Sequence, residues 1–463
     1  MNIFANRKSE LHTLESEYAK ESARFVVIYG RRRIGKTTLI KEFLKNKPYI
    51  YFLADRQIEI ELIDRFRDVV SEYLKYPHIK EIDFKTWDSI IDYWIRHSDF
   101  STKVVVVIDE FQYIARVNSA FPSILQRIWD EKLKSKNIML ILCGSLINMM
   151  YSTTLSYNSP LYGRRTGQLK VEPISFNAFS EFFPNLRTER LIEFYSVIGG
   201  VPKYMEIFNP KKDVFHNIRE YILNKTGYLY AEPRFILSDE LTETTTYFSI
   251  LKTIAQGERK MGNIAARLMT PTQNLTGYFN VLIDLDILER RVPVTEEMPE
   301  KSKMGLYFIK DNFFRFWFRY VFANQNYLEL ENTDYVLQKI KDDFDEFVSI
   351  TFEDIAPYIL FSKEMIKKLP FEPDKWGRWW DRNDEIDLIA LNKKEKKALF
   401  VECKWSKRPV DVDVMENLKR KANRVEWFKE KRKDYFAIIS RKGFTKRLHD
   451  YSEKYGVILI SIS

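Results

Sequence analysis

A glycine-rich segment near the N-terminus has the residue types and the spacing that hold phosphate groups. Residues 30–38 read GRRRIGKTT and fit the pattern G-x-x-x-x-G-K-S/T. In such a loop, backbone N–H groups surround the phosphates, the lysine contacts the β- and γ-phosphates, and the threonine hydroxyl reaches Mg²⁺. A buried strand is predicted at 23–29 and a helix at 38–45, which is the context this pattern requires. We therefore expect nucleotide contacts from Gly30, Arg33, Ile34, Gly35, Lys36, Thr37 and Thr38, with Thr37 also at the metal.

Two acidic residues follow a second apolar run. The run 104–108 predicts a buried strand, and Asp109 and Glu110 come directly after it. A parallel sheet presents its ligands at this edge. Asp109 is expected to hold Mg²⁺, directly or through water, and Glu110 to orient and deprotonate the attacking water. A lone Asp-Glu pair is usually a solvated loop, but beside a phosphate loop it favours hydrolysis of ATP over passive binding.

A serine ends the next predicted strand, 138–143. Ser145 follows Cys143 and Gly144. In ATPases with this strand order, a polar residue at this place senses the γ-phosphate, so Ser145 is a third candidate. The alternative is an ordinary turn serine.

Several motifs together resemble those of the archaeal-type P-loop ATPases, a branch related to the AAA+ and STAND ATPases. Besides the segments above, they are FANR at 4–7, SPLYGRR at 159–165 and GGVP at 199–202, so the resemblance covers the whole chain. It implies that Asn6 and Arg7 lie near the adenine and that Pro202 touches the base. It also implies that Arg164 or Arg165 stabilises charge on the transferred phosphoryl group, in its own subunit or in a neighbour within a homo-oligomer. A surface arginine pair and a helix-breaking turn are the alternatives.

A second group of carboxylates lies near the C-terminus. Glu402 and Lys404 are two residues apart on a predicted strand and therefore face the same side. Asp387 lies on the preceding predicted strand and can meet them if the two strands pair as a hairpin. With Glu353 on a predicted helix, these carboxylates and the lysine can bind Mg²⁺ and activate water against a phosphodiester. The arrangement resembles the PD-(D/E)XK nucleases of the restriction-endonuclease fold. The alternative is that the carboxylates only form salt bridges with nearby lysines, and Cys403 is expected to face the core rather than act as a nucleophile.

The C-terminal part is also the basic part of the chain. Residues 391–450 hold 19 Lys and Arg against 9 Asp and Glu, whereas the whole chain has a net charge of +9. This concentration favours an anionic partner, and DNA is the partner we expect; a solvated lysine-rich surface is the alternative. The residues expected to contact phosphates are Lys407, Arg408, Lys419, Arg420, Lys421 and Arg424.

These residues need a scaffold of several domains, because 463 residues correspond to about three domains. Alternating apolar and amphipathic stretches predict an α/β fold whose P-loop NTPase parallel sheet lies within 1–176. A helical lid is expected at 177–239. Three short helices and two strands predict a winged helix, with a connecting helix, within 240–330. A small α/β, restriction-endonuclease-like domain is expected at 335–463. The aromatic run 311–320 has helical spacing and is expected to be buried rather than to stack on bases.

The composition excludes several classes of protein. Two cysteines cannot form a disulfide scaffold and favour a reducing cytoplasm. No apolar run approaches the ~20 residues that span a bilayer, so no membrane partner is expected. The leading hypothesis is an ATP-driven protein that acts on DNA and carries a Mg²⁺-dependent nuclease domain. A STAND-type regulatory switch with a non-catalytic C-terminal module is the second hypothesis, and a small-molecule kinase is the weakest.

Overall fold

The computed structural model describes residues 6–241 and 243–462, which form two compact units. The first contains the residues up to Ile174 together with Val201–Lys203 and the segment 236–241. The second contains the remaining described residues. The segment predicted as a helical lid, 177–239, is therefore divided between the two units.

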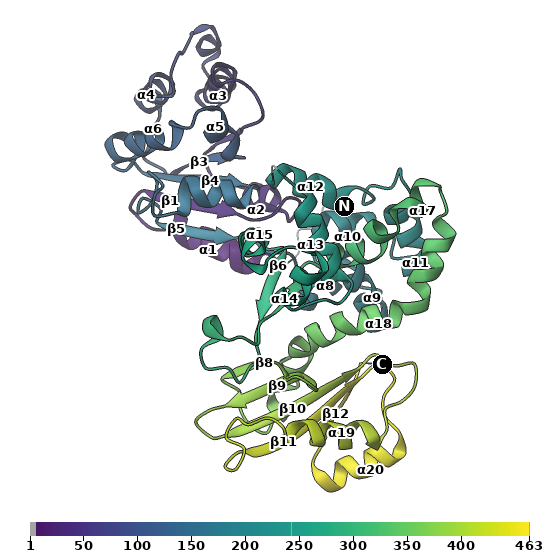
Figure 1. Cartoon of the computed structure of the whole chain (residues 1–463). Coiled ribbons are helices and arrows are strands. Elements are labelled where there is room, and N and C mark those ends of the chain that lie inside the picture. Colours follow the sequence, from purple (N-terminus) through teal and green to yellow (C-terminus); the bar gives the residue numbers. More distant parts are fainter. Residues whose placement is uncertain (1–5, 242, 463) are drawn as a thin grey trace. The chain divides into compact units, whose positions relative to one another are not determined.

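A five-stranded parallel sheet forms the centre of the first unit (Figure 1). The strands lie in the order β2-β3-β4-β1-β5. Strands β1, β3 and β4 lie where the sequence analysis expected them, and β5, which is short and only partly buried, was not predicted. Their bounds are β1 (Arg24–Tyr29), β2 (Tyr49–Leu53), β3 (Val104–Asp109), β4 (Ile138–Gly144) and β5 (Gly167–Lys170).

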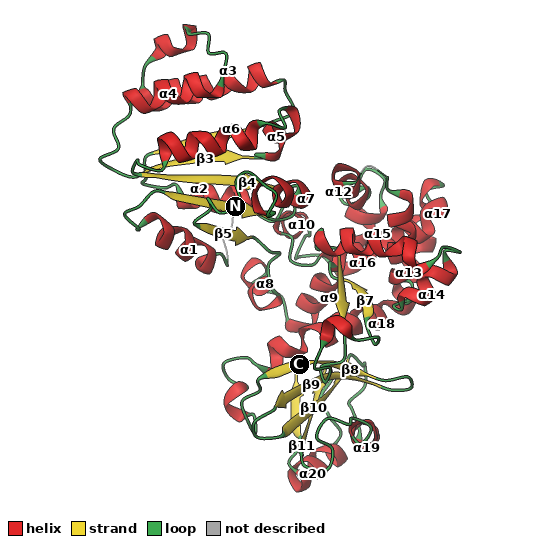
Figure 2. Cartoon of the chain, turned by 60° about the vertical axis from the view of Figure 1, so that its left-hand side comes forward, coloured by secondary structure: helices red, strands yellow, loops and turns green. Residues whose placement is uncertain are grey.

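Helices cover both faces of this sheet, as the buried strands require. Alternate residues of β1 point to opposite faces, so Phe25 and Val27 join one hydrophobic cluster and Val26 and Ile28 join another. Figure 2 shows α3, α4 and α6 on one side and α1 on the other. The helices are α1 (Lys8–Tyr18), α2 (Lys36–Phe43), α3 (Glu59–Leu74), η1 (Pro77–Glu81), α4 (Trp87–His97), α5 (Gln112–Val117), α6 (Phe121–Ile128), η2 (Trp129–Leu133), α7 (Ile147–Met150) and η3 (Tyr151–Leu155).

The helical part that follows leads to three helices and a two-stranded antiparallel sheet, in the order that the sequence predicted. In the helix 272–284, Leu275, Phe279 and Leu282 are buried, and Gln273, Asn274 and Thr276 are exposed. The first helices are α8 (Phe176–Phe182), α9 (Thr188–Ile198), α10 (Pro202–Ile207), α11 (Val214–Asn217), η4 (Ile218–Leu223) and α12 (Glu232–Glu240). The later elements are α13 (Thr245–Ala255), α14 (Met261–Arg267), α15 (Thr272–Asp284), β6 (Leu288–Arg291), η5 (Pro299–Lys301) and β7 (Leu306–Ile309).

The aromatic run is buried, as predicted. It forms α16 (Asn312–Phe316) and η6 (Trp317–Val321), in which Phe313, Phe316 and Trp317 are at most 1% exposed. Base stacking on this run is therefore excluded in this structure. After η7 (Phe322–Asn324) and α17 (Gln325–Glu329), the long helix α18 (Thr333–Leu360) leads into the C-terminal domain.

A second five-stranded sheet forms the C-terminal domain, in the order β12-β11-β10-β9-β8 (Figure 1). Strands β8, β9 and β10 pair antiparallel to one another, and β11 and β12 run parallel to β10. Both α18 and α19 pack against β9 and β10. The elements are η8 (Ile366–Lys368), β8 (Lys375–Trp380), β9 (Glu385–Asn392), β10 (Lys397–Lys404), α19 (Val412–Ala422), β11 (Lys433–Ser440), α20 (Lys446–Tyr455) and β12 (Ile458–Ser461).

The predicted fold class, α/β with a P-loop-type parallel sheet and a separate smaller sheet domain, is confirmed. Across 6–241 and 243–462, every helix is too short or too polar to cross a bilayer.

One carboxylate connects four elements of the second unit. Asp354 on α18 forms ion pairs with Arg291 of β6 at 2.7 Å, Arg315 of α16 at 3.3 Å and Arg378 of β8 at 3.0 Å. Burial raises the pKa of Asp354, but the three guanidinium groups outweigh burial and hold that pKa well below its usual range. Removing this charge would leave three arginines around a neutral group.

We expect Asp354→Asn to lower the free energy of unfolding by about 2–4 kcal/mol. This expected loss of stability is smaller than that for breaking a fully buried ion pair, because the Asp354 side chain is 21% exposed. Urea unfolding followed by tryptophan fluorescence measures the change. Because the folded pKa is depressed, this stabilisation is present above the pKa of an unfolded aspartate, about 3.9, and is lost as the pH falls through the folded pKa.

Asp342→Asn is the matched control. Asp342 is exposed on the same helix and accepts a hydrogen bond from Gln338, so its loss should change stability by less than about 0.5 kcal/mol. Equal effects of the two substitutions would show that the arginines do not depend on Asp354.

Candidate functional site

The phosphate loop connects the end of β1 to the start of α2, and its glycines are required by its shape. A Cβ at Gly30 would lie 2.3 Å from the carbonyl oxygen of Val171, closer than any side chain tolerates. Gly35 has a φ of +89°, which glycine adopts without strain. Arg33 also has a positive φ, +67°, although it is not glycine. Ile34 is buried and Thr38 is exposed in the first turn of α2.

Lys36 lies across this loop. Its side chain is almost fully buried, and its Nζ donates hydrogen bonds to the carbonyl oxygens of Gly30 at 2.9 Å and Arg31 at 2.8 Å. Burial lowers the pKa of Lys36, while the nearby Cys143, Glu110 and Asp109 act in the opposite direction. The sequence prediction that this lysine serves the loop agrees with its position.

Asp109 is completely buried at the end of β3 and accepts two hydroxyl hydrogen bonds. Thr37 donates through Oγ1 at 2.9 Å and Tyr51 through its phenol at 2.6 Å. A carboxylate beside a threonine hydroxyl is the oxygen donor set that Mg²⁺ prefers, so the residues present fit a nucleotide-bound magnesium ion. Tyr51 was missed in the sequence; its alternation on β2, two residues before the partner of Asp109, is the signal that would have found it.

Glu110 is held by two polar side chains from neighbouring elements. Its Oε2 accepts hydrogen bonds from the Ser145 hydroxyl at 2.7 Å and from the Gln112 amide. A Cβ at Gly144 would lie 2.3 Å from Oε1 of Gln112, so only glycine leaves room for this amide. The Oε1 atom of Gln112 is buried without a hydrogen-bond partner in the part of the chain that the structure describes.

The same carboxylate sits on a strained backbone. Glu110 has a φ of +56°, a conformation that persists at functional sites when the surroundings impose it. The structure thus brings Ser145 to Glu110, as the two predicted roles require. Gln112 was not predicted from the sequence, and its place two residues after Glu110 was the available signal.

Two further residues from the sequence motifs lie at the loop. Arg7 is buried and donates to the carbonyl oxygens of Ile34 at 2.9 Å and Glu172 at 2.7 Å. These two hydrogen bonds connect the phosphate loop to the segment that follows β5. Cγ of Pro202 lies 4.0 Å from the Cβ position of Gly35. Asn6 is exposed at the start of the described chain, and the two residues before it in the motif lie outside the described residues.

In the C-terminal domain, β9 and β10 form the expected antiparallel hairpin. Leu388 pairs with Val401, which makes Asp387 and Glu402 the next facing pair. Both carboxylates are buried, and Asp387 accepts a hydrogen bond from the Cys403 N–H at 2.7 Å. Burial, followed by the negative charges of Glu353 and Glu402, raises the pKa of Asp387.

The predicted three-carboxylate metal site is not assembled. Glu353 forms an ion pair with Arg378 at 2.6 Å, and Glu402 forms ion pairs with Lys404 at 2.8 Å and Lys421 at 3.0 Å. Across residues 6–241 and 243–462, no group of three or more His, Cys, Asp or Glu side chains is placed to hold a metal ion. Basic side chains pair with two of the three carboxylates in this structure, and the expectation that these residues are joint metal ligands stays a prediction.

Comparison with known proteins places this geometry in a family. Residues 4–208 match the model of an ATPase domain predominantly from Archaea, and residues 317–424 match a model of archaeal and bacterial proteins of unknown function. The chain is 38% identical to the uncharacterized protein MJECL04 of Methanocaldococcus jannaschii over 95% of this chain and 96% of that protein. The chain belongs to the archaeal P-loop ATPase family. It is an ATPase domain joined to a separate C-terminal sheet domain.

Two solved structures are similar to this chain at low identity. The Walker-type ATPase Paby2304 of Pyrococcus abyssi is 20% identical with a TM-score of 0.47, over 69% of this chain and 96% of that one. The ORC2 protein of Aeropyrum pernix, in ADPNP and ADP complexes, is 13% identical with a TM-score of 0.44, over 71% of this chain and 96% of that one.

The two candidate arginines of this archaeal ATPase lie away from its phosphate loop. They precede β5, whose first residue, Gly167, pairs with Val26 near the start of β1, whereas the loop follows the end of β1. At ~3.3 Å per residue, the two places are roughly 15 Å apart along the strand. Arg164 pairs with Asp130 at 3.0 Å, and the guanidinium of Arg165 lies over the Tyr162 ring.

Most of the basic residues that were expected to contact DNA have partners within the chain. Arg420 pairs with Asp384, Arg424 with Asp381 and Lys407 with Asp345, while Lys419 donates to the Tyr451 hydroxyl. Three of these six residues therefore pair with aspartates that lie outside the basic segment. Arg408 is exposed. Cys403 is buried, and burial raises the pKa of its thiol, which agrees with its predicted core position.

We expect Glu110→Gln to reduce kcat for ATP hydrolysis by about 10²- to 10⁴-fold, because the amide oxygen can still accept the hydrogen bond from Ser145 but takes no proton from water. Nucleotide binding, measured by fluorescence titration with a labelled ATP analogue, should change little. Glu131→Gln, at an exposed position of the same unit, is the control and should keep normal turnover. Normal turnover in Glu110→Gln would show that another residue is the general base.

Proposed function

We propose that this archaeal ATPase couples ATP hydrolysis to work on DNA and that its C-terminal domain is a Mg²⁺-dependent nuclease-like domain. The observation that carries the proposal is the placement of Asp387, Glu402 and Lys404 at one end of the β9–β10 hairpin. Two buried carboxylates beside a lysine are the parts of a metal-assisted hydrolytic site. The element order α18–β8–β9–β10–α19–β11, with a mixed sheet, is typical of the PD-(D/E)XK fold and supports the same assignment.

At the nucleotide site, different residues of the chain have different roles. The loop backbone and Lys36 bind the phosphates. Thr37 and Asp109, which are hydrogen-bonded to each other, would hold the magnesium ion. Glu110 takes the proton of the attacking water once it leaves its hydrogen bonds with Ser145 and Gln112. Bound Mg²⁺ would neutralise phosphate charge there.

DNA contact is proposed for the three helices and hairpin of 245–309, taken as a winged helix. Gln273, Asn274 and Thr276 are exposed along α15, on the side opposite its buried leucines, as a recognition helix requires. In the C-terminal domain, the exposed Arg408 is the proposed phosphate contact.

A second candidate function is a STAND-type switch whose C-terminal domain binds a partner without catalysis. The ion pairs on Glu353 and Glu402 favour it, because a carboxylate that is already neutralised by arginine or lysine is a weaker metal ligand. On this alternative, ATP repositions the lid and the protein turns ATP over slowly.

Cleavage of DNA separates the two functions. Linear, branched and single-stranded DNA are incubated with Mg²⁺, with and without ATP, and products are resolved on denaturing gels. We expect cleavage by the wild type and a loss of at least about 100-fold in Lys404→Ala, since this lysine orients or deprotonates the nucleophilic water. Lys36→Ala shows whether ATP gates the reaction.

Lys397→Ala is the matched control, because Lys397 lies on the same strand at its other end, beside Glu395. It should cleave normally. A wild type that hydrolyses ATP but cuts none of these substrates would contradict the nuclease proposal and favour the switch.

We further propose that Arg164 or Arg165 acts on the nucleotide of a neighbouring copy in a homo-oligomer. ATPase activity per chain should then rise with protein concentration as copies assemble. The active arginine, changed to alanine, should remove most of this rise, up to 10³-fold in kcat, and leave the dilute activity unchanged. Activity is measured across concentrations beside light scattering.

Arg127→Ala is the control, since Arg127 also forms a surface ion pair, with Asp88, at 2.7 Å. Activity per chain that is independent of concentration in an assembled wild type would argue against an arginine supplied by a neighbour.

A further inference from the structure

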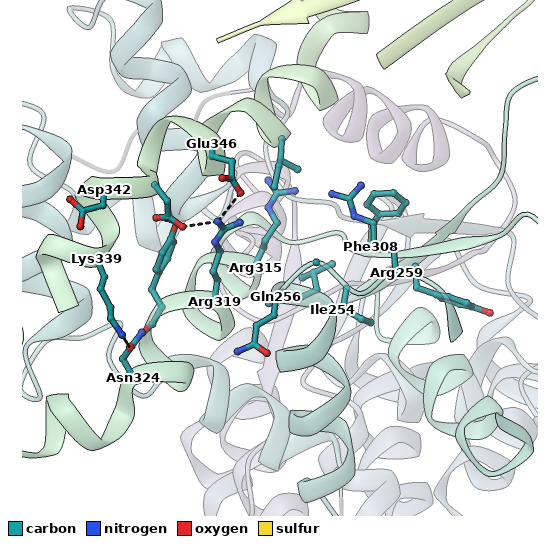
Figure 3. A pocket seen from close by; sticks show the side chains of 17 residues that line it. Ile254, Gln256, Arg259, Phe308, Arg315, Arg319, Asn324, Lys339, Asp342 and Glu346 are labelled. Atoms are coloured by element: carbon teal, nitrogen blue, oxygen red, sulfur yellow. Dashed lines mark hydrogen bonds and ion pairs between the residues drawn. The ribbon is translucent and has the colours of Figure 1, made fainter. Parts of the chain in front are cut away.

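A cavity of about 590 Å³ lies within the second unit, far along the chain from the phosphate loop. Its walls come from the end of α13, from β7, from the aromatic helices α16 and η6, and from α18 (Figure 3). The volume is in the range of small-molecule sites. Neither the nucleotide site nor the C-terminal carboxylates contribute to it.

Most charged side chains that line this cavity are compensated. Arg319 donates to Asp343 at 2.6 Å and to Glu346 at 3.1 Å, which Figure 3 marks with dashed lines. Lys339 donates to Oδ1 of Asn324 at 3.0 Å. Arg315 uses its terminal nitrogens for Asp354 and Thr351.

Arg259 is the exception. Its guanidinium group has no hydrogen bond or ion pair among the residues that the structure describes, although it lines the cavity and is half-buried. The group lies 4.6 Å from the centre of the Phe308 ring, which Arg291 also approaches at 4.5 Å. Contact with an aromatic ring holds the guanidinium in place but leaves its N–H donors unused.

The neighbouring Arg315 repeats this pattern at one atom. Its side chain is 9% exposed, and its Nε is buried without a hydrogen-bond partner within the described chain. Two arginines of one cavity thus have unused N–H donors. A guanidinium stays charged in proteins, and an N–H donor that is buried without an acceptor costs free energy that a bound anion recovers.

We propose that this cavity binds a small phosphate-bearing ligand through Arg259. A planar guanidinium presents paired donors that match phosphate oxygens. The ligand is compact rather than a nucleic acid strand, because Asp342 and Glu346 line another wall, where an extended polyanion would be repelled. The site is separate from the proposed nuclease and stands whether or not that proposal holds.

Phosphate binding to the full-length Lys36→Ala protein tests the proposal, since this background weakens the phosphate loop as a second site. Titration calorimetry with inorganic phosphate should show one saturable site, and Arg259→Gln in the same background should weaken it at least tenfold. Arg259→Lys should bind between the two. Arg267→Gln, an exposed arginine on the adjacent α14, is the matched control and should bind like the parent. Adenosine monophosphate and a short single-stranded oligonucleotide, titrated in parallel, separate a compact ligand from a strand.

Thermal unfolding without phosphate tests whether Arg259 is merely structural. Because Arg259 has no ion pair to lose, Arg259→Gln should keep or raise the melting temperature, whereas phosphate should raise that of the parent alone. A large fall in melting temperature, equal phosphate binding in parent and Arg259→Gln, or binding of the oligonucleotide only, would each overturn the proposal. A phosphate-soaked crystal of the parent locates the ion independently, and phosphate density away from Arg259 would also overturn it.

Discussion

A fully buried aspartate at the end of β3 organises the nucleotide site. A carboxylate without solvent persists only when hydrogen bonds replace its water, and Asp109 obtains them from Thr37 of the loop and Tyr51 of β2. Those bonds fix the first turn of α2 against the sheet edge, and the Glu110 N–H adds a third at 3.0 Å. Lys36 and the left-handed turn at Glu110, whose carboxylate accepts from Ser145, lie around this one buried charge.

The second unit depends on charge in a different way. Asp354 gathers arginines from β6, α16 and β8, so the hairpin, the aromatic helix and the C-terminal sheet share one anion. Arg378 extends the network to Glu353, which explains why that carboxylate is not free to join Asp387 and Glu402. Arg259 lies near the same network but has no ion pair in it, and that imbalance is what points to a ligand.

The sequence predicted those features that local pattern decides. Buried parallel strands are continuous apolar runs, and a glycine that must adopt a positive φ, such as Gly35, marks its turn in the sequence. The facing of Asp387 and Glu402 followed from strand alternation and a hairpin. Side-chain partners were out of reach, because they depend on contacts between distant segments. Nothing near Arg420 in the sequence shows that it forms an ion pair with Asp384, 36 residues earlier. Nor does the sequence show that the Gln112 amide donates a hydrogen bond to Glu110.

If Arg164 or Arg165 acts on the nucleotide of a neighbouring copy, as proposed, the placement of these arginines limits how copies of this ATPase can assemble. They lie at the start of β5, whereas the phosphate loop lies at the end of β1, so one copy's arginine end would have to meet another copy's loop end. Such a contact joins two different surfaces and is heterologous, which generates a closed ring or an open helical array but no two-fold pair. In an open array, the last copy has a loop without a neighbour, so one site in every array would stay incomplete. Ring closure would therefore raise the number of competent sites by one without changing any single site.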